Sequence, residues 1–240
     1  RDRGRWWCGG HLYNEVLPIP ERIPEVMARL GCILLCAVAS AIIAFLLVVQ
    51  SGQKRIALAK STVLVKVGKG HGSGVAIGNR FVITAAHVVG SESEVVLSTS
   101  KGEEYPADVL WTNGPHDVAL LRMREDYGIS VSRLNCTDTP SIGQRLEAIG
   151  NPGKLEFVHS WGRVSGPIQE LFRWKVAFIA DLGIAPGSSG GPVIDERGRV
   201  IGIVVGVSVT YLGGMIPSPT NFSVVVPANG GICQLLARQG

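Results

Sequence analysis

One short stretch of the sequence combines a serine with glycines in a way that packing alone does not explain. Ser189 follows Gly187 by two residues and precedes Gly190 and Gly191. Glycine adopts positive φ without steric cost and lets the backbone approach a ligand closely. Such a turn would expose the Ser189 hydroxyl and direct the N–H groups of Gly187 and Ser189 at one point, as a developing oxyanion requires. A Gly/Ser/Pro surface turn is the alternative interpretation.

A histidine and an aspartate at the ends of two apolar runs supply the other groups of a nucleophilic site. His87 lies near the end of the apolar run Ile83–Val89, and Asp117 directly precedes the run Val118–Leu121. A serine hydroxyl is a weak nucleophile that needs an adjacent base, and an imidazole accepts and returns protons near pH 7. Taken singly, the two residues could be a satisfied strand-end histidine and a turn aspartate. Together with Ser189 they favour a catalytic triad.

The remaining histidines and the cysteines predict no metal site. No carboxylate or cysteine lies at ligand spacing from these histidines, and His116 would point to the strand face opposite to Asp117. The five cysteines form no disulfide framework and no C-x-x-C pair. Cys136 and Cys233 could form one bridge, although two buried thiols are the favoured interpretation.

The composition favours a folded domain and gives no support to nucleic-acid binding. Of the 240 residues, 46% are hydrophobic and 18% charged, with 31 glycines and 13 prolines. After the first ~60 residues about 180 remain, which is enough for one domain with a substantial core. The net charge of +4 is spread along the chain, and no Lys/Arg cluster is interleaved with aromatic residues. Because the sequence starts with arginine, we expect it to be a piece of a longer protein.

An apolar run near the N-terminus is long enough to cross a bilayer. From Leu30 to Gln53 no residue is charged, and a bilayer core needs about 20 such residues. A cleaved signal peptide is the alternative, but its apolar region usually has only about 7–15 residues. We expect a juxtamembrane segment at 1–29, a single transmembrane helix at 30–50 and a linker at 51–60. Basic residues flank the span equally, so the side of the membrane stays open.

From residue 61 to residue 240 the pattern changes to short β runs separated by turns. Thr62–Val67 alternates in hydrophobicity, and Gln144–Ile149 ends at the turn Gly150–Gly153. Roughly a dozen such runs follow one another without long helices between them. This pattern predicts an all-β domain of two antiparallel six-stranded β-barrels. A parallel α/β hydrolase is excluded because its crossover helices are missing, although the G-x-S-x-G motif of those enzymes is present at 187–191.

Six motifs in order resemble those of the trypsin-like serine proteases, and in detail those of the HtrA/Do-like branch. They are Gly72–Ile77, Asp117–Leu121, Gly150–Pro152, Gly162–Ser165, Pro186–Pro192 with Asp181, and Asn221–Asn229. The resemblance covers about residues 61–237, with Ser188 at a position where asparagine is usual. It implies the trypsin-like fold for the two barrels.

The resemblance also implies roles for the residues of the site. His87 would be the general base, Asp117 the residue that orients its imidazole, and Ser189 the nucleophile that forms an acyl-enzyme. An oxyanion hole is implied at Gly187, Ser188 and Ser189. The implied partners are protein or peptide substrates and, through residues 30–50, the membrane. No cofactor is expected.

A substrate pocket is expected on the same resemblance. The base of the primary pocket in this fold lies six residues before the nucleophile, which here is Gly183. An acidic residue there selects Lys or Arg, and glycine offers no counter-charge. Asp181 matches an aspartate that HtrA-like enzymes keep outside the pocket. With Val205 and Val207 flanking Gly206 on the far wall, the expected P1 residues are small or aliphatic.

Two other interpretations stay open. A membrane span before a compact protease also resembles the layout of some positive-strand RNA virus polyproteins, so a polyprotein-processing protease is one alternative. A catalytically inactive protease fold that serves as a binding module is the other. No PDZ module is recognised in the sequence, so cage-forming quality control is not expected. The natural substrate and the oligomeric state stay open.

Overall fold

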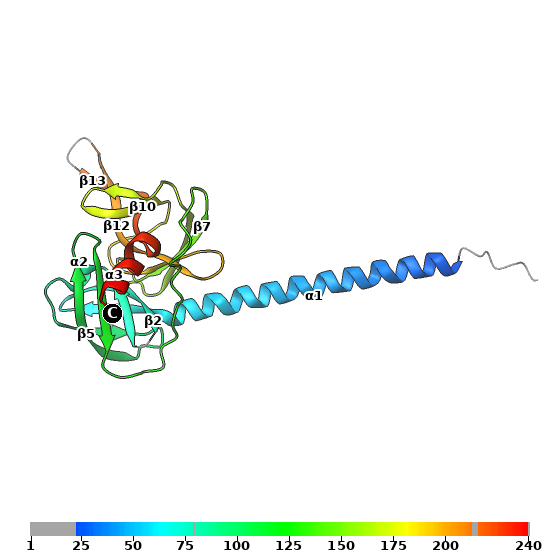
Figure 1. The fold of residues 1–240 in the computed structure, drawn as a ribbon, viewed down its shortest axis with the longest axis horizontal. Coiled ribbons are helices and arrows are strands. Elements are labelled where there is room, and N and C mark those ends of the chain that lie inside the picture. The colour runs from blue at the N-terminus through cyan, green and yellow to red at the C-terminus, as the bar shows by residue number, and fades with distance from the viewer. Residues whose placement is uncertain (1–22, 79, 213–215, 240) are drawn as a thin grey trace, which may run out of the picture. The chain divides into compact units, whose positions relative to one another are not determined.

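The chain forms one long helix followed by a series of strands, as the computed structural model shows (Figure 1). The structure describes residues 23–78, 80–212 and 216–239. Most of the expected juxtamembrane segment at 1–29 therefore lies outside the described residues. The first strand begins at Thr62, within the segment 61–240 for which β structure was expected.

Helix α1 runs from Ile23 to Ser61. Its centre, Arg29–Gln50, has a mean hydropathy of 3.1 and is long and apolar enough to cross a membrane, and none of it is buried. Leucine and alanine are strong helix formers, and Lys60 in the last turn interacts favourably with the negative end of the helix dipole. The segment 51–60, which we expected as a linker, is helical as well.

The first half of the β domain is a closed barrel of six antiparallel strands in the order β1-β2-β3-β6-β5-β4. Alternate residues such as Val63 and Val65 of β1 point into its core and are fully buried. A short helix, α2 (Ala86–Val89), follows β3. The strands are β1 (Thr62–Val67), β2 (Gly70–Gly78), β3 (Phe81–Thr84), β4 (Glu94–Ser98), β5 (Glu104–Asn113) and β6 (Val118–Met123).

The second half is a seven-stranded antiparallel sheet in the order β8-β7-β11-β12-β13-β10-β9. The all-β class is confirmed, and where the sequence predicted a second six-stranded barrel the structure has this seven-stranded sheet, in which the short strand β9 pairs with β10. A bridge between Val164 and Ala180 brings the end of β8 to β10. The elements are β7 (Arg145–Gly150), β8 (Val158–Arg163), β9 (Gln169–Leu171), β10 (Trp174–Ala180), β11 (Pro192–Ile194), β12 (Val200–Leu212), β13 (Ile216–Pro227), the π-helical turn η1 (Ala228–Ile232) and α3 (Cys233–Gln239).

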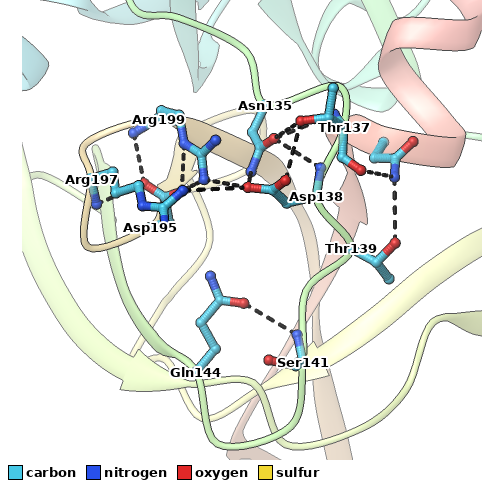
Figure 2. A network of polar contacts seen from close by, with 10 residues as sticks. Asn135, Thr137, Asp138, Thr139, Ser141, Gln144, Asp195, Arg197 and Arg199 are labelled. Carbon is cyan, nitrogen blue, oxygen red and sulfur yellow. Dashed lines mark hydrogen bonds and ion pairs between the residues drawn. The ribbon is translucent and has the colours of Figure 1, made fainter.

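A polar network connects the segment between β6 and β7 to the turn between β11 and β12 (Figure 2). The Asn135 side-chain oxygen accepts the backbone N–H of Asp138 at 3.0 Å, and Arg199 donates to the Asp138 carboxylate at 2.6 Å. Arg199 also donates to Asp195 at 2.9 Å. The hydrogen bond from Arg199 lowers the pKa of Asp138. Because β11 directly follows the Ser189 turn, this network fixes the strand that leaves that turn.

The same segment is joined to the C-terminal helix by a disulfide between Cys136 and Cys233, whose Cα atoms are 5.7 Å apart. The preference for two buried thiols was therefore wrong. Cys136 lies at the surface, and the two cysteines are 97 residues apart in sequence. Only the packing of α3 brings them together. The other cysteines that the structure describes, Cys32 and Cys36, are exposed and unbridged in α1.

Candidate active site

His87 and Asp117 meet where two connections of the first barrel lie side by side. His87 is in α2, just after β3, and Asp117 closes the turn between β5 and β6 with φ of 55°. His87 Nδ1 lies 2.7 Å from Asp117 Oδ2, and the His87 backbone N–H donates to Asp117 Oδ1 at 2.9 Å. Since an ionised carboxylate only accepts, Nδ1 carries the proton. Nε2 therefore remains available as a base.

Asp117 is ionised although it is almost completely buried. Its side chain is 6% exposed, whereas that of His87 is 36% exposed. Burial by itself raises the pKa of Asp117, but the hydrogen bonds from the side chain and backbone of His87, with a further one from Trp174, outweigh it and hold the pKa below its usual value. At neutral pH a buried carboxylate thus faces His87 and can stabilise an imidazolium.

The sequence did not single out Trp174 or Arg173. Trp174, the first residue of β10, donates its indole N–H to Asp117 Oδ2 at 3.1 Å. A guanidinium nitrogen of Arg173 lies 3.5 Å from the same oxygen. An aromatic residue at the start of a strand is usually part of the core, so the sequence carried no signal of this contact.

The Ser189 turn has the backbone geometry that its glycines suggest. Gly187 and Gly190 have φ of 101° and 84°. A Cβ on Gly190 would collide with the Ser73 carbonyl oxygen and lie 2.9 Å from the Ala85 nitrogen. The turn therefore packs tightly against the residue that follows β3, two residues before His87.

Both halves of the β domain hold this turn. On the β2 side, Ser73 donates its backbone N–H to the Ser189 carbonyl at 2.7 Å and its hydroxyl to the Gly187 carbonyl at 2.8 Å. On the β12 side, the Gly190 N–H donates to the Val204 carbonyl at 2.7 Å. The Asn151 side chain in turn donates to the Ser73 hydroxyl at 3.0 Å. Ser73 and Asn151 belong to the Gly72–Ile77 and Gly150–Pro152 motifs, which was the only sequence signal of their role.

Of the three backbone N–H groups expected to form the oxyanion hole, one already makes a hydrogen bond and two do not. The Ser188 N–H donates to the Ala185 carbonyl at 3.0 Å, so it does not serve as an oxyanion donor in this structure. The N–H groups of Gly187 and Ser189 make no hydrogen bond within residues 23–78, 80–212 and 216–239. Among these residues no hydrogen bond joins Ser189 Oγ to His87. Catalytic hydrogen bonds are often long or absent in proteases without substrate.

The residues expected to line the substrate pocket differ in their exposure. Gly183 is exposed and Val207 is half-buried, but Val205 is 1% exposed and packs in the core. Val205 therefore does not line an open pocket. A Cβ on Gly206 would lie 2.8 Å from Cη2 of Trp174, so the indole covers one side of that glycine. The Asp181 carboxylate accepts the Arg163 backbone N–H.

The remaining described histidines have local partners. His116 Nδ1 contacts the Asn113 side chain at 2.9 Å, and burial lowers the pKa of His116. His159 contacts Glu147 at 2.6 Å, and His71 Nε2 contacts the Asn151 carbonyl at 2.9 Å. No group of three or more potential metal ligands occurs in the described part of the chain.

Comparisons with known proteins agree with this geometry. Residues 72–203 match the model of the trypsin-like peptidase domain. The chain is 29% identical over 198 residues to protease Do-like 1 of the Arabidopsis thaliana chloroplast, and 32% identical over 158 residues to the putative serine protease HhoA of Synechocystis. The alignments cover 74% and 62% of this chain but 42% and 40% of those relatives. The chain thus spans less than half of their length.

Solved structures share the fold. Rv3671c protease in its inactive form matches with a TM-score of 0.64 at 23% identity, over 78% of this chain and 92% of that one. The HtrA-type protease AlgW with a tripeptide matches with a TM-score of 0.67 at 20% identity, over 78% of this chain and 62% of that one. These matches confirm the all-β fold that the resemblance implied.

Proposed function

The chain belongs to the trypsin-like peptidase domain family, and we propose on this basis that it is a serine endopeptidase of the HtrA/Do-like type. The observation that carries the proposal is the double contact of the buried Asp117 with His87, beside a glycine-flanked serine. We assign Ser189 as nucleophile, His87 as general base and Asp117 as the residue that fixes the imidazole. Membership of the trypsin-like peptidase domain family supports these three roles.

Acylation begins when His87 Nε2 accepts the proton of Ser189 Oγ, which attacks the carbonyl carbon of the scissile peptide. The electron pair of the carbonyl moves to its oxygen, and the N–H groups of Gly187 and Ser189 donate to the resulting oxyanion. The tetrahedral intermediate collapses to an acyl-enzyme when the C–N bond breaks. His87 gives its proton to the leaving amine.

Deacylation repeats the sequence with water as the nucleophile. His87 accepts a proton from water, which attacks the acyl carbon, and the proton returns to Ser189 Oγ when the ester bond breaks. Throughout, the carboxylate of Asp117 faces an imidazole that is alternately neutral and positively charged. The low pKa of Asp117 keeps this residue ionised over the whole cycle.

We further propose that the enzyme cleaves after small or aliphatic P1 residues such as Val, Ala, Ile or Leu. Gly183 offers no counter-charge at the base of the pocket, and the Asp181 carboxylate is occupied by the Arg163 N–H. Burying an aliphatic side chain stabilises a complex by about 1.5–3 kcal/mol, whereas an unpaired ammonium costs more than it gains. Mass spectrometry of a P1-randomised peptide library should show aliphatic P1 residues.

A matched variant makes this test sharper. Gly183→Asp adds a carboxylate at the proposed pocket base, so cleavage after Lys or Arg should rise in the same library. Ser141→Asp adds the same charge at an exposed position before β7 that is not among the proposed pocket residues, and should leave the P1 profile unchanged. Predominant cleavage after Lys or Arg by the unmodified enzyme would contradict the pocket assignment.

We also propose that residues 30–50 anchor the enzyme in a membrane as a single span. The support is an exposed stretch of α1 that carries no charged residue from Leu30 to Gln50 and is long enough to cross a bilayer. We expect the full chain to stay with membranes after alkaline carbonate washing and to be released by detergent. Val38→Arg with Ile42→Arg should weaken that retention, because a central arginine costs about 2.5–3.5 kcal/mol on insertion. Release of the unmodified chain by carbonate alone would contradict the anchor.

A further inference from the structure

Trp174 contacts the same carboxylate oxygen that holds the imidazole. Its indole N–H donates to Asp117 Oδ2 at 3.1 Å, and His87 Nδ1 contacts this oxygen at 2.7 Å. The other oxygen, Oδ1, accepts the backbone N–H of His87. Without Trp174, both remaining hydrogen bonds to the carboxylate would come from His87 itself, with Arg173 only as a looser ion pair at 3.5 Å. Trp174 thus supplies a hydrogen bond that ties Asp117 to the second half of the β domain.

The indole is itself held in place from several sides. It is 8% exposed and belongs to the core. The Lys175 N–H donates to the Pro115 carbonyl at 2.8 Å, which joins the start of β10 to the turn that carries Asp117. The guanidinium of Arg173 lies 5.0 Å from the centroid of the indole, and Gly206 packs against the ring. A donor confined in this way can restrict the orientation of the carboxylate.

We propose that Trp174 is a positioning residue of the triad, whose indole N–H fixes the plane of the Asp117 carboxylate and through it the imidazole of His87. The inference rests on the proposed function. A catalytic base must keep its productive orientation because small displacements cost large factors in rate. The indole also lies on Gly206, so it connects the triad to the strand proposed to form the substrate pocket.

Trp111 and Arg173 help to distinguish this positioning role from an effect of core packing and from an effect of charge. Trp111 also packs against the core, and its buried indole N–H has no hydrogen-bond partner in the described part of the chain. The fold therefore tolerates an indole without a partner. Arg173 lies near Asp117, but its side chain is 64% exposed and the separation is 3.5 Å, so solvent weakens its effect.

The test removes only the N–H. Replacement of Trp174 by 3-benzothienylalanine keeps the size and shape of the bicyclic ring, and Trp174→Phe is the simpler companion variant. A hydrogen bond to a buried charge corresponds to a rate factor of about 10- to 100-fold. We expect kcat of the full chain in detergent to fall by that factor with KM changed less than about threefold. Trp111→Phe should leave both constants unchanged.

A second readout does not depend on turnover. The proton on His87 Nδ1 should give a far-downfield ¹H NMR resonance, assigned by its absence in His87→Ala. We expect this resonance to shift or to be lost through exchange in both Trp174 variants and to persist in Trp111→Phe. An unchanged resonance with wild-type kcat would overturn the proposal. If the unmodified chain cleaves no peptide, the proposed function fails, and the resonance alone still decides the role of Trp174.

Discussion

Ser189→Ala is expected to lower kcat by a factor of about 10⁵–10⁶, with little change in the stability of the fold. The variant removes the atom that forms the acyl-enzyme, and only binding and the oxyanion donors remain to assist water. Adding His87→Ala to it should cost little more, because the members of a triad act as a unit and their losses are not additive. The measurement is kcat on one peptide substrate for the two single variants and the double variant.

Ser188→Ala is the matched control for this experiment. Ser188 is adjacent in sequence and buried, and its N–H is used within the turn. The substitution removes a hydroxyl of the same kind from the same turn, so kcat should stay within about tenfold of the unmodified enzyme. If Ser189→Ala turned over substrate at a comparable rate, or if the losses in the double variant multiplied, the assignment of the nucleophile would be wrong.

Gly187→Ala is expected to lower kcat by a factor of about 10²–10³, the usual cost of losing an oxyanion donor. A Cβ at this position would collide with the Asn151 carbonyl and lie 2.7 Å from His71 Nε2, on a backbone with φ of 101°. The turn must therefore shift, and the N–H groups of Gly187 and Ser189 no longer converge. The measurement is kcat together with the thermal midpoint of unfolding.

Gly143→Ala separates backbone strain from loss of the oxyanion site. Gly143 has φ of 84°, and a Cβ added there would meet no atom within 4 Å, so its substitution carries the strain of a positive φ without touching the Ser189 turn. It should lower the thermal midpoint but leave kcat unchanged. Equal kcat values for both glycine variants would show that the Gly187 N–H makes no contribution to the reaction.

The sequence predicted those parts of the site that depend on local backbone chemistry. Positive φ at Gly187 and Gly190 follows from a glycine-rich turn. The pairing of His87 with Asp117 was expected from the chemical roles of the two residues, and the pairing of β3 with β6 brings them to the same side of one barrel. The fold class was predictable because short alternating runs without long helices leave few architectures.

The parts that the sequence did not predict depend on contacts between distant residues. Trp174 and Asp117 are joined across 57 positions, and nothing in either segment indicates the other. Val205 was expected at a pocket wall, but its side chain turns into the core. The Cys136–Cys233 bridge exists because α3 packs beside the segment that precedes β7. Such pairings follow from tertiary packing, which no local pattern specifies.

The most direct test of the account is covalent labelling of the full chain with a fluorophosphonate, followed by mass spectrometry of the labelled peptide. The phosphonate reacts only with a serine that a neighbouring base activates, so the result does not depend on knowing the substrate. The account predicts one adduct on Ser189 in the unmodified protein, and its loss in His87→Ala while the fold is retained. A folded, unmodified protein that takes up no label, or an adduct on Ser188 instead, would contradict it.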